Sequence, residues 1–441
     1  MNKKTENKAV SPWQWVPSLY FAQGIPYVVV MSVAVILFKR MGMSNTDIAL
    51  YTSGLNLPWV IKPLWSPLVD LLKTKRWWIV VMQILVGAGL AGIALTIQGP
   101  LAFRYCLAFM WLLAFSSATH DIAADGFYML GLNEKKQAYF VGIRNTFYRF
   151  AVIFGQGILV MFAGWLEQRY AREMPETAAI PQAWSLTFYL LTILFALLFV
   201  YHYLFLPHPR RDTCTLPPQQ ASAGRVFKEF LGTFTSFFQK KHIVSALIFI
   251  LLYRFAEAQL VKITSPFLLD TPATGGLALS TAEVGFIYGT IGVIALTIGG
   301  IVGGIAMARR GLKSCLWTMT IAMNLPNIVY LYLSFARPES IGIISGCVAI
   351  EQFGYGFGFT SLTYFMMLFS NGKHQTAHYA ICTGFMALGL MLPGMISGWI
   401  EESIGYRAFF VWIRLCTIPS FWATHLVRKN LTDNHSDNSS R

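Results

Sequence analysis

Long apolar runs, separated by short polar segments, recur along the whole chain and constrain its fold more than any other feature. A helix needs about 20 mostly apolar residues to cross the hydrocarbon core of a bilayer. Twelve runs reach that length, at residues 13–38, 47–70, 77–98, 102–131, 139–165, 183–206, 243–269, 281–308, 314–335, 340–370, 376–399 and 406–427. Because the bilayer core holds no water to satisfy backbone N–H and C=O groups, each run predicts a membrane-spanning helix.

The composition excludes the soluble alternatives. Hydrophobic residues make up 55% of the 441 residues and charged residues only 12%, about half of their share in soluble globular proteins. So apolar a chain could not stay disordered in water either. The sequence therefore predicts an all-α polytopic membrane protein in contact with the lipid bilayer. The net charge of +14 does not indicate nucleic acid, because the cations gather on one side of the membrane.

The distribution of Lys and Arg predicts the orientation. With the N-terminus in the cytoplasm, the cytoplasmic segments carry 21 Lys and Arg, and the segments on the opposite side carry 7. Lys and Arg near the ends of spans are enriched on the cytoplasmic side. We therefore expect a multi-pass protein with both termini in the cytoplasm.

Short motifs recur between the two halves at nearly one offset. A capping box opens the second and eighth spans, a Phe-Ala-Gln or Phe-Ala-Glu motif lies in the first and seventh, and Gly-Trp-x-Glu ends the fifth and eleventh. The pairs are Ser44–Asp47 with Ser280–Glu283, Phe21–Gln23 with Phe255–Glu257, and Gly164–Glu167 with Gly398–Glu401, which lie 236, 234 and 234 residues apart. This offset indicates duplication of a six-helix unit, a common plan of transporters, in which the substrate site lies between the halves.

The least apolar part of the chain lies between the halves and predicts the domain boundaries. We expect an N-terminal six-helix bundle over residues 1–206, a cytoplasmic linker over 207–242, and a C-terminal six-helix bundle with a short cytoplasmic tail over 243–441. Within the linker, apolar residues at helical spacing between 226 and 238, with basic residues among them, predict an amphipathic helix lying in the membrane interface.

The segment after the second span resembles the signature of a transporter family. Residues Ser66-Pro-Leu-Val-Asp70-Leu-Leu-Lys73-Thr-Lys75-Arg76 resemble the G-x-x-x-D-R-x-G-R-R signature of the major facilitator superfamily and depart from it at Ser66, Leu71 and Lys73. The copy in the second half, residues 304–313, keeps the glycines and lacks the acid. The resemblance implies the major facilitator fold, with twelve transmembrane helices in two six-helix pseudo-repeats. It also implies a gating loop formed by Asp70, Lys73, Lys75 and Arg76.

Within that superfamily the chain resembles the AmpG-type muropeptide permeases. The resemblance is carried by Leu57–Asp70, Asp121–Gly126, Gly142–Arg144, Thr264–Leu268 and Gly398–Glu401. It implies a secondary active transporter of the cell inner membrane, not an enzyme, which imports cell-wall-derived anhydromuropeptides (GlcNAc-anhydroMurNAc peptides) or related sugars by proton symport and alternating access. We expect a monomer that uses no cofactor or metal and whose partners are protons and an anionic glycopeptide or sugar.

Other functions stay open at this point. A permease of the same superfamily for another sugar or for an acyl-nucleotide would have the same spans, and a membrane-embedded enzyme or a sensor is a weaker alternative. The motif His120-Asp121-x-x-x-Asp125 is similar to part of the metal site of phosphatidyl-group transferases. That chemistry needs four acids on two successive turns, and the sequence does not supply the second pair.

Charged residues inside the spans are the main candidates for function, because a charge at bilayer depth is costly. Asp121 and Asp125 are one helical turn apart and face the same way. Counted from the turn between the fourth and fifth spans, Asp125 and Arg144 lie at matching depths. We expect proton coupling through an intramembrane network of Asp121, Asp125, Arg144, Lys62, Glu257 and Glu351, with Asp125 as the proton-linked acid and Arg144 or Lys62 as its partner.

Polar and aromatic residues near these charges are candidates for substrate binding. In the family that the chain resembles, spans one, four, seven and ten line the central cavity. The candidates are Gln23, Tyr20, Tyr27, Tyr253, Lys262, Gln352 and Tyr355. The amides would hydrogen-bond a sugar and the tyrosines would stack on it, while the excess of cations over acids inside the spans suits an anionic substrate.

Overall fold

The computed structural model describes residues 11–209, 212, 232, 234–371 and 375–439, and within these ranges the chain is helical, with no strand. The helices of the N-terminal half are α1 (Pro12–Val28), η1 (Val29–Val33), α2 (Ala34–Arg40), α3 (Asn45–Gly54), α4 (Leu57–Leu72), α5 (Lys75–Thr96), α6 (Ala102–Gly131), α7 (Glu134–Val152), η2 (Ile153–Ile158), α8 (Leu159–Tyr170) and α9 (Glu176–Phe205). The helices of the C-terminal half are α11 (Ile243–Leu252), α12 (Phe255–Leu269), α13 (Thr281–Val284), η3 (Gly285–Gly292), α14 (Val293–Asn324), η4 (Leu325–Asn327), α15 (Ile328–Ala336), α16 (Ile341–Ser370), α17 (Gln375–Leu415) and α18 (Ile418–Ser439).

These helices form twelve spans, as the sequence predicts. Within the described residues, eight helical stretches are long and apolar enough to cross a membrane. Two of them, of 56 and 54 residues, are about twice the length of a span, and each reverses direction at a glycine with positive φ, Gly311 (φ 72°) and Gly405 (φ 75°). The two spans that remain, and that bring the number to twelve, are α3–α4 and α16. The first is interrupted at residues 55–56, and the second carries Glu351 and Gln352 inside the membrane.

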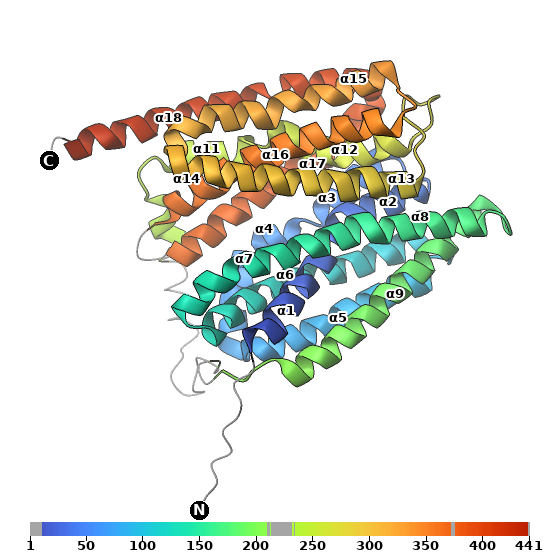
Figure 1. Ribbon diagram of the computed structural model, residues 1–441, viewed down its shortest axis with the longest axis horizontal. Helices are drawn as coiled ribbons and strands as arrows, with labels where there is room; N and C mark the ends of the chain where they lie inside the picture. The colour runs from blue at the N-terminus through green and yellow to red at the C-terminus, as the bar shows by residue number, and fades with distance from the viewer. Residues whose placement is uncertain (1–10, 210–211, 213–231, 233, 372–374, 440–441) are drawn as a thin grey trace, which may run out of the picture.

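The six spans of each half pack mainly with one another. Figure 1 shows the N-terminal half, blue to green, in the lower part of the molecule and the C-terminal half, yellow to red, above it. Within the first half α5 packs on α6 and α9, and α1 packs on α6 and α7, while in the second half α14 packs on α16 and α12 on α17. The halves meet where α17 packs on α3 and α4, and where α8 packs on α13.

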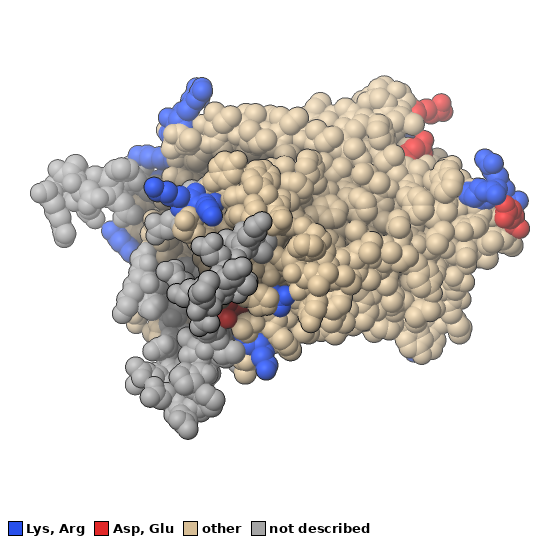
Figure 2. Space-filling model, turned by 60° about the horizontal axis from the view of Figure 1, so that its bottom comes forward, with Lys and Arg blue, Asp and Glu red and all other residues tan. Residues whose placement is uncertain are grey.

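The two ends of the bundle differ in their connections. We call the end at which α9 ends and α11 begins the linker end, and the opposite end, with residues 41–44, 171–175 and 270–280, the distal end. Across the distal end, α8 lies against α13 and α3 against α17, whereas nearer the linker end α4 lies against α17 and α7 barely touches α14. On the face drawn in Figure 2, charged residues gather toward the two ends and a broad uncharged surface lies between them, as a bilayer requires.

Polar side chains begin several of the spans. Ser44 accepts a hydrogen bond from the backbone N–H of Asp47, and Ser280 forms the full capping box with Glu283. Thr74 and Asn133 cap α5 and α7 in the same way. Each cap satisfies an N–H group that has no partner within its own helix, so the chain can turn sharply between spans.

The amphipathic helix predicted between residues 226 and 238 lies largely outside the described residues. Of its apolar side chains, Phe237 is fully buried. Its ring lies 5.9 Å from that of Phe369, 5.5 Å from that of His378 and 6.4 Å from that of Phe385. This end of the segment therefore packs into the core of the C-terminal half.

Candidate functional site

The two aspartates of α6 point into the same part of the N-terminal half. Asp121, Asp125 and Tyr128 follow at intervals of four and three residues, which places them on one face of the helix. The residues between them, Ala123 and Ala124, are fully buried in the core of this half. Helical periodicity thus separates a packing face from a polar face.

Asp121 is bound by residues from two other helices. Lys62 of α4 forms an ion pair with its Oδ2, and Gln23 of α1 donates its amide N–H to Oδ1. The side chains of Lys62 and Asp121 each keep 22% of their surface exposed. The amide N–H of Gln23 is therefore already engaged by a carboxylate, whereas its Oε1 is buried without a hydrogen bond.

Asp125, one turn further along α6, has its own cation. Arg144 Nη1 of α7 lies 3.3 Å from Asp125 Oδ1, and the hydroxyl of Tyr20 donates to the same oxygen across 3.1 Å. The guanidinium of Arg144 lies over the rings of Tyr20 and Tyr128, 4.7 Å and 5.3 Å from their centroids. Arg144 and Asp125 keep 28% and 39% of their side-chain surface exposed, so this pair is partly open although it lies inside the spans.

His120 faces away from this cluster. Gln83 of α5 contacts His120 Nε2 at 3.2 Å and His202 Nδ1 of α9 at 2.8 Å, and all three residues are buried. His202 Nε2 also lies 3.0 Å from Ser18 Oγ. The histidine of the His-Asp motif is therefore a packing residue. No group of three or more His, Cys, Asp and Glu side chains able to hold a metal occurs in the part of the chain that the structure describes.

The C-terminal half has a single buried ion pair at the corresponding place. Arg254 lies at the break between α11 and α12, where its Nη2 is 2.8 Å from Glu257 Oε2 and its Nε is 2.9 Å from the same oxygen. Arg254 Nη2 also donates to the hydroxyl of Tyr355 across 2.7 Å. Its guanidinium lies 5.2 Å and 5.0 Å from the ring centroids of Tyr355 and Phe359. The side chains of Arg254 and Glu257 are only 9% and 7% exposed.

The repeat relates these two clusters. Arg254 and Glu257 each lie 234 residues after their counterparts Tyr20 and Gln23. The same two positions of the repeat therefore hold neutral donors in one half and an ion pair in the other. Tyr27 lies within electrostatic range of Arg254, which belongs to the opposite half.

Four other predicted residues lie within the packing of their own half. Glu351, which is 2% exposed, accepts hydrogen bonds from the hydroxyl of Tyr330 (3.0 Å) and from Gln352 Nε2 (2.9 Å). Tyr253 is fully buried, and its hydroxyl lies 3.1 Å from the carbonyl of Gly358 and 2.8 Å from Ser361 Oγ. The ring of Tyr27 packs on Trp59 at 5.3 Å. The structure thus shows Glu351, Gln352, Tyr253 and Tyr27 in contact with their own half.

Lys262 is a buried lysine of α12. It is 2% exposed, and no carboxylate of the described residues lies within ion-pair distance of it. Its aliphatic stem lies beside Gly394 of α17, where an added Cβ would be 3.5 Å from Lys262 Cγ and 2.6 Å from Ser53 Oγ of the opposite half. Ser53 Oγ is itself buried without a hydrogen bond. Lys262 therefore lies where the two halves touch.

The predicted gating loop is only partly described. The helical backbone at Asp70 is described, and its side chain lies outside the described residues. Asp212 accepts hydrogen bonds from the backbone N–H groups of Lys75 (2.7 Å) and Arg76 (3.1 Å) and so caps α5. Arg76 donates to the carbonyl of Leu206 (3.3 Å), and Lys73 lies over the ring of Trp77 at 5.9 Å. The loop is thus tied to the segment that follows α9.

Some residues of these clusters were not among the predicted sites. Arg254, Tyr128 and Tyr379 belong to this group, and Tyr379 of α17 lies within electrostatic range of Asp125 and Lys62 of the opposite half. For Arg254 a signal was present in the sequence, since an arginine inside an apolar span is costly. For the two tyrosines no signal was present, because tyrosine is frequent in spans for other reasons.

Twelve spans in two related halves, with charge clusters inside the membrane, define a membrane transporter rather than an enzyme. The chain belongs to the Major Facilitator Superfamily, which it matches over residues 18–392. Within the superfamily it resembles the permeases of the AmpG type.

Two relatives support this assignment over most of the chain. The protein is 25% identical to transporter AmpG 4 of Rickettsia conorii (strain ATCC VR-613 / Malish 7), over 92% of this chain and 93% of that one. It is 24% identical to the anhydromuropeptide permease of Escherichia coli (strain K12), over 94% of this chain and 79% of that one.

Solved transporter structures share the fold. The nucleoside transporter NupG superposes with a TM-score of 0.68 at 14% identity, over 94% of this chain and 98% of that one. A D-xylose-proton symporter superposes with a TM-score of 0.66 at 13% identity, over 93% and 95% of the two chains. At such low identity these likenesses show the architecture alone.

Proposed function

We propose that this permease imports anhydromuropeptides (GlcNAc-anhydroMurNAc peptides) or closely related anionic sugars together with protons, by alternating access. The observation that carries the proposal is the Asp125–Arg144 pair, which is ion-paired and yet 39% and 28% exposed inside the spans. The name of the relative from Escherichia coli supports the substrate class.

In this proposal Asp125 is the acid that takes up the proton. Arg144 favours the charged form of Asp125, because an opposite charge within about 4–6 Å stabilises a carboxylate. A carboxylate of the substrate would compete for Arg144, and Asp125 would then lose its partner and bind a proton. Substrate and proton thus favour each other's binding, which is the requirement for symport. Asp121, held by Lys62 and Gln23, keeps the same helix face in place.

The C-terminal half would supply the second contact to the substrate. Arg254 presents a planar guanidinium over two neighbouring aromatic rings, and such a group is suited to carboxylate binding. Glu257 neutralises Arg254 while the site is empty, and it too would be exposed to competition from the substrate. Lys262, which is buried where the two halves touch, is a further candidate for substrate binding.

The proposal also includes the topology. The protein would lie in the cell inner membrane as a monomer with both termini in the cytoplasm, so the linker end faces the cytoplasm. The N-terminal bundle over residues 1–206 and the C-terminal bundle over 243–441 would rock about the site as two bodies joined by the linker at 207–242. The excess of Lys and Arg in the segments of the linker end supports this orientation.

The test is uptake of labelled anhydromuropeptide into proteoliposomes under an imposed pH gradient. We expect accumulation when the outside is acidic, and none when the gradient is collapsed with a protonophore. A neutral sugar that lacks the peptide carboxylates should compete poorly. Uptake that ignores the gradient would contradict symport, whereas gradient-driven uptake of the neutral sugar alone would contradict the substrate class.

A further inference from the structure

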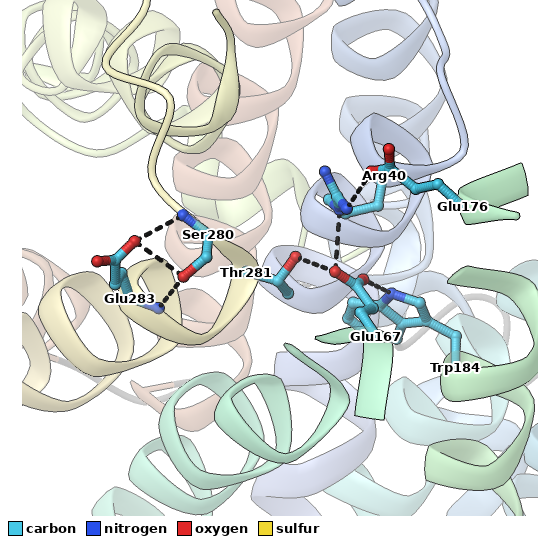
Figure 3. Close-up of polar contacts among 7 residues, drawn as sticks. All are labelled: Arg40, Glu167, Glu176, Trp184, Ser280, Thr281 and Glu283. Carbon is cyan, nitrogen blue, oxygen red and sulfur yellow. Dashed lines mark hydrogen bonds and ion pairs between the residues drawn. The ribbon is translucent and has the colours of Figure 1, made fainter. Parts of the chain in front are cut away.

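Polar contacts that the proposed transport site does not use join the two halves at the distal end. Glu167, at the end of α8, is buried, and its Oε2 accepts a hydrogen bond across 2.7 Å from Oγ1 of Thr281, the first residue of α13. Within its own half Glu167 is bound by Arg40 Nε at 3.1 Å and by Trp184 Nε1 at 2.8 Å, as Figure 3 shows. One carboxylate therefore connects the N-terminal half to the start of a helix in the C-terminal half.

The repeat places a second carboxylate in the equivalent position. Glu401 lies 234 residues after Glu167 and is also buried. Its Oε2 accepts a hydrogen bond across 2.6 Å from Nδ2 of Asn45, which begins α3 of the opposite half. Thr281 and Asn45 each follow the serine that caps their helix, Ser280 and Ser44. The two contacts are thus related by the duplication, with the roles of the halves exchanged.

A glycine three residues before each carboxylate allows the halves to touch. A Cβ added at Gly164 would lie 2.3 Å from the backbone nitrogen of Ala282, and one added at Gly398 would lie 2.0 Å from the carbonyl oxygen of Asn45. Neither position has room for a side chain while the distal end is closed. The Gly-Trp-x-Glu motif therefore combines a close backbone approach with a carboxylate that crosses to the other half.

We propose that Glu167 and Glu401 are positioning residues of the transport cycle, which hold the distal ends of the two halves together while the central site is open toward the linker end. Each carboxylate contacts the first residue of a helix in the opposite half, where the helix dipole favours negative charge. Opening the distal end must break both hydrogen bonds and hydrate both buried carboxylates. The proposal rests on the chain being a transporter and does not depend on which substrate it carries.

The Glu167 and Glu401 contacts differ in the interactions that are lost when the halves part. Glu167 keeps Arg40 and Trp184 when the halves part, because both belong to its own half. Near Glu401 the cation is Lys39 of the opposite half, which pairs with Asp270 across 2.7 Å. Parting the halves there breaks this ion pair and also the hydrogen bonds between Asn45 Nδ2 and both Glu401 and Tyr406. We therefore expect the Glu401 contact to contribute more to closure than the Glu167 contact.

The test measures closure of the distal end as the distance between two spin labels, determined by double electron–electron resonance. The labels are placed on Arg172→Cys and Ala273→Cys, which lie in exposed distal loops of the two halves, in a background without the native cysteines and without substrate or gradient. Thr281→Val and Asn45→Leu each remove the donor from one contact and leave the carboxylate in place. Ser280→Ala is the matched control, because it removes a helix cap next to Thr281 that stays within one half.

We expect the parent and Ser280→Ala to show one short distance. Thr281→Val should raise the ratio of the long to the short distance by about tenfold, as the loss of one hydrogen bond to a charged group predicts, and Asn45→Leu should raise it more. Gly398→Ala should give mainly the long distance. If Asn45→Leu does not fold, Asn45→Ala, which also removes the donor, replaces it. Distance distributions of both donor variants that match Ser280→Ala would overturn the proposal, whatever the outcome of the muropeptide assay.

Discussion

Arg144 Nη1 lies 3.3 Å from Asp125 Oδ1, and the two side chains nevertheless keep 28% and 39% of their surface exposed. In a fully buried bridge, the loss of one partner leaves the other charge without solvent, which is strongly destabilising. A partly exposed bridge can exchange its partners at lower cost. The Arg254–Glu257 pair, with exposures of 9% and 7%, lies closer to the buried limit. This difference favours Asp125 over Glu257 as the site of proton coupling.

Replacement of Asp125 should stop accumulation of substrate against its gradient while exchange of substrate across the membrane continues. We expect Asp125→Asn to abolish gradient-driven accumulation and to leave counterflow exchange measurable, because substrate can still bind when the proton site is lost. Asp121→Asn should slow uptake and preserve accumulation, since Asp121 has its own cation in Lys62. Coupling would be wrong if Asp125→Asn fails to fold and the double variant Asp125→Asn, Arg144→Gln regains accumulation, because the bridge would then be structural.

Replacement of Arg254 should weaken substrate binding. Lysine keeps the positive charge but loses the planar fork and the stacking on Tyr355 and Phe359. We expect Arg254→Lys to raise the Kd for an anionic muropeptide by about tenfold, the range of one charge-assisted hydrogen bond, when measured by calorimetry on the purified protein. Glu351→Gln is the control, because Glu351 binds Tyr330 and Gln352 within the C-terminal half. If Arg254→Lys binds the anionic muropeptide with unchanged affinity, the carboxylate of the substrate does not bind Arg254.

The cap of α5 should contribute to stability and not to the transport step. Asp212 accepts hydrogen bonds from two backbone N–H groups at the start of this helix. Asp212→Ala should reduce stability by about 1 kcal/mol, the usual net contribution of a hydrogen bond, seen as a lower apparent melting temperature in detergent. Lys73→Ala, which removes only a surface contact with Trp77, should leave the melting temperature unchanged. A loss of transport without a change in melting temperature would instead give Asp212 a part in gating.

The Gln83 network should be the most sensitive polar position in the core of the N-terminal half. Gln83→Leu leaves His120 and His202 without their common partner. An unsatisfied buried polar group costs about 1–3 kcal/mol, so we expect a clear fall in the melting temperature, measurable by the temperature dependence of fluorescence-detected gel filtration. Thr119→Val is the control, because Thr119 is exposed and bonds only the carbonyl of Phe115 on its own helix. Equal melting temperatures of Gln83→Leu and the parent protein would show that water takes over the hydrogen bonds that Gln83 makes to His120 and His202.

The number of spans and their grouping into two related halves could be predicted from the sequence alone. A bilayer admits only segments that satisfy their own backbone hydrogen bonds, so the length of each apolar run determines the element that it forms. Gly311 and Gly405 each lie between two such runs, and the structure places sharp reversals at both. The resemblance of Ser66–Arg76 to the superfamily signature is confirmed by the match to the Major Facilitator Superfamily.

The composition of the candidate site could be predicted only in part. Depth along a helix follows from counting residues, and this brought Asp125 and Arg144 to the same level. Rotation about the helix axis decides whether two residues at one level meet, and rotation depends on packing with neighbouring helices. Glu351 and Gln352 show the consequence, since they lie in the predicted span and bind each other and Tyr330 inside their own half.

The sequence by itself determined the membrane class, the twelve spans and the duplication, because these depend on apolar length and on local repetition. Only the tertiary structure decided which charges are paired, which pairs keep solvent exposure, and that Glu167 and Glu401 cross between the halves. These properties depend on contacts between residues far apart in the chain, such as Asn45 and Glu401, and no local pattern specifies a contact over that distance. The Gly-Trp-x-Glu motif is visible in the sequence as a repeat, but its position between the two halves is a property of the folded molecule.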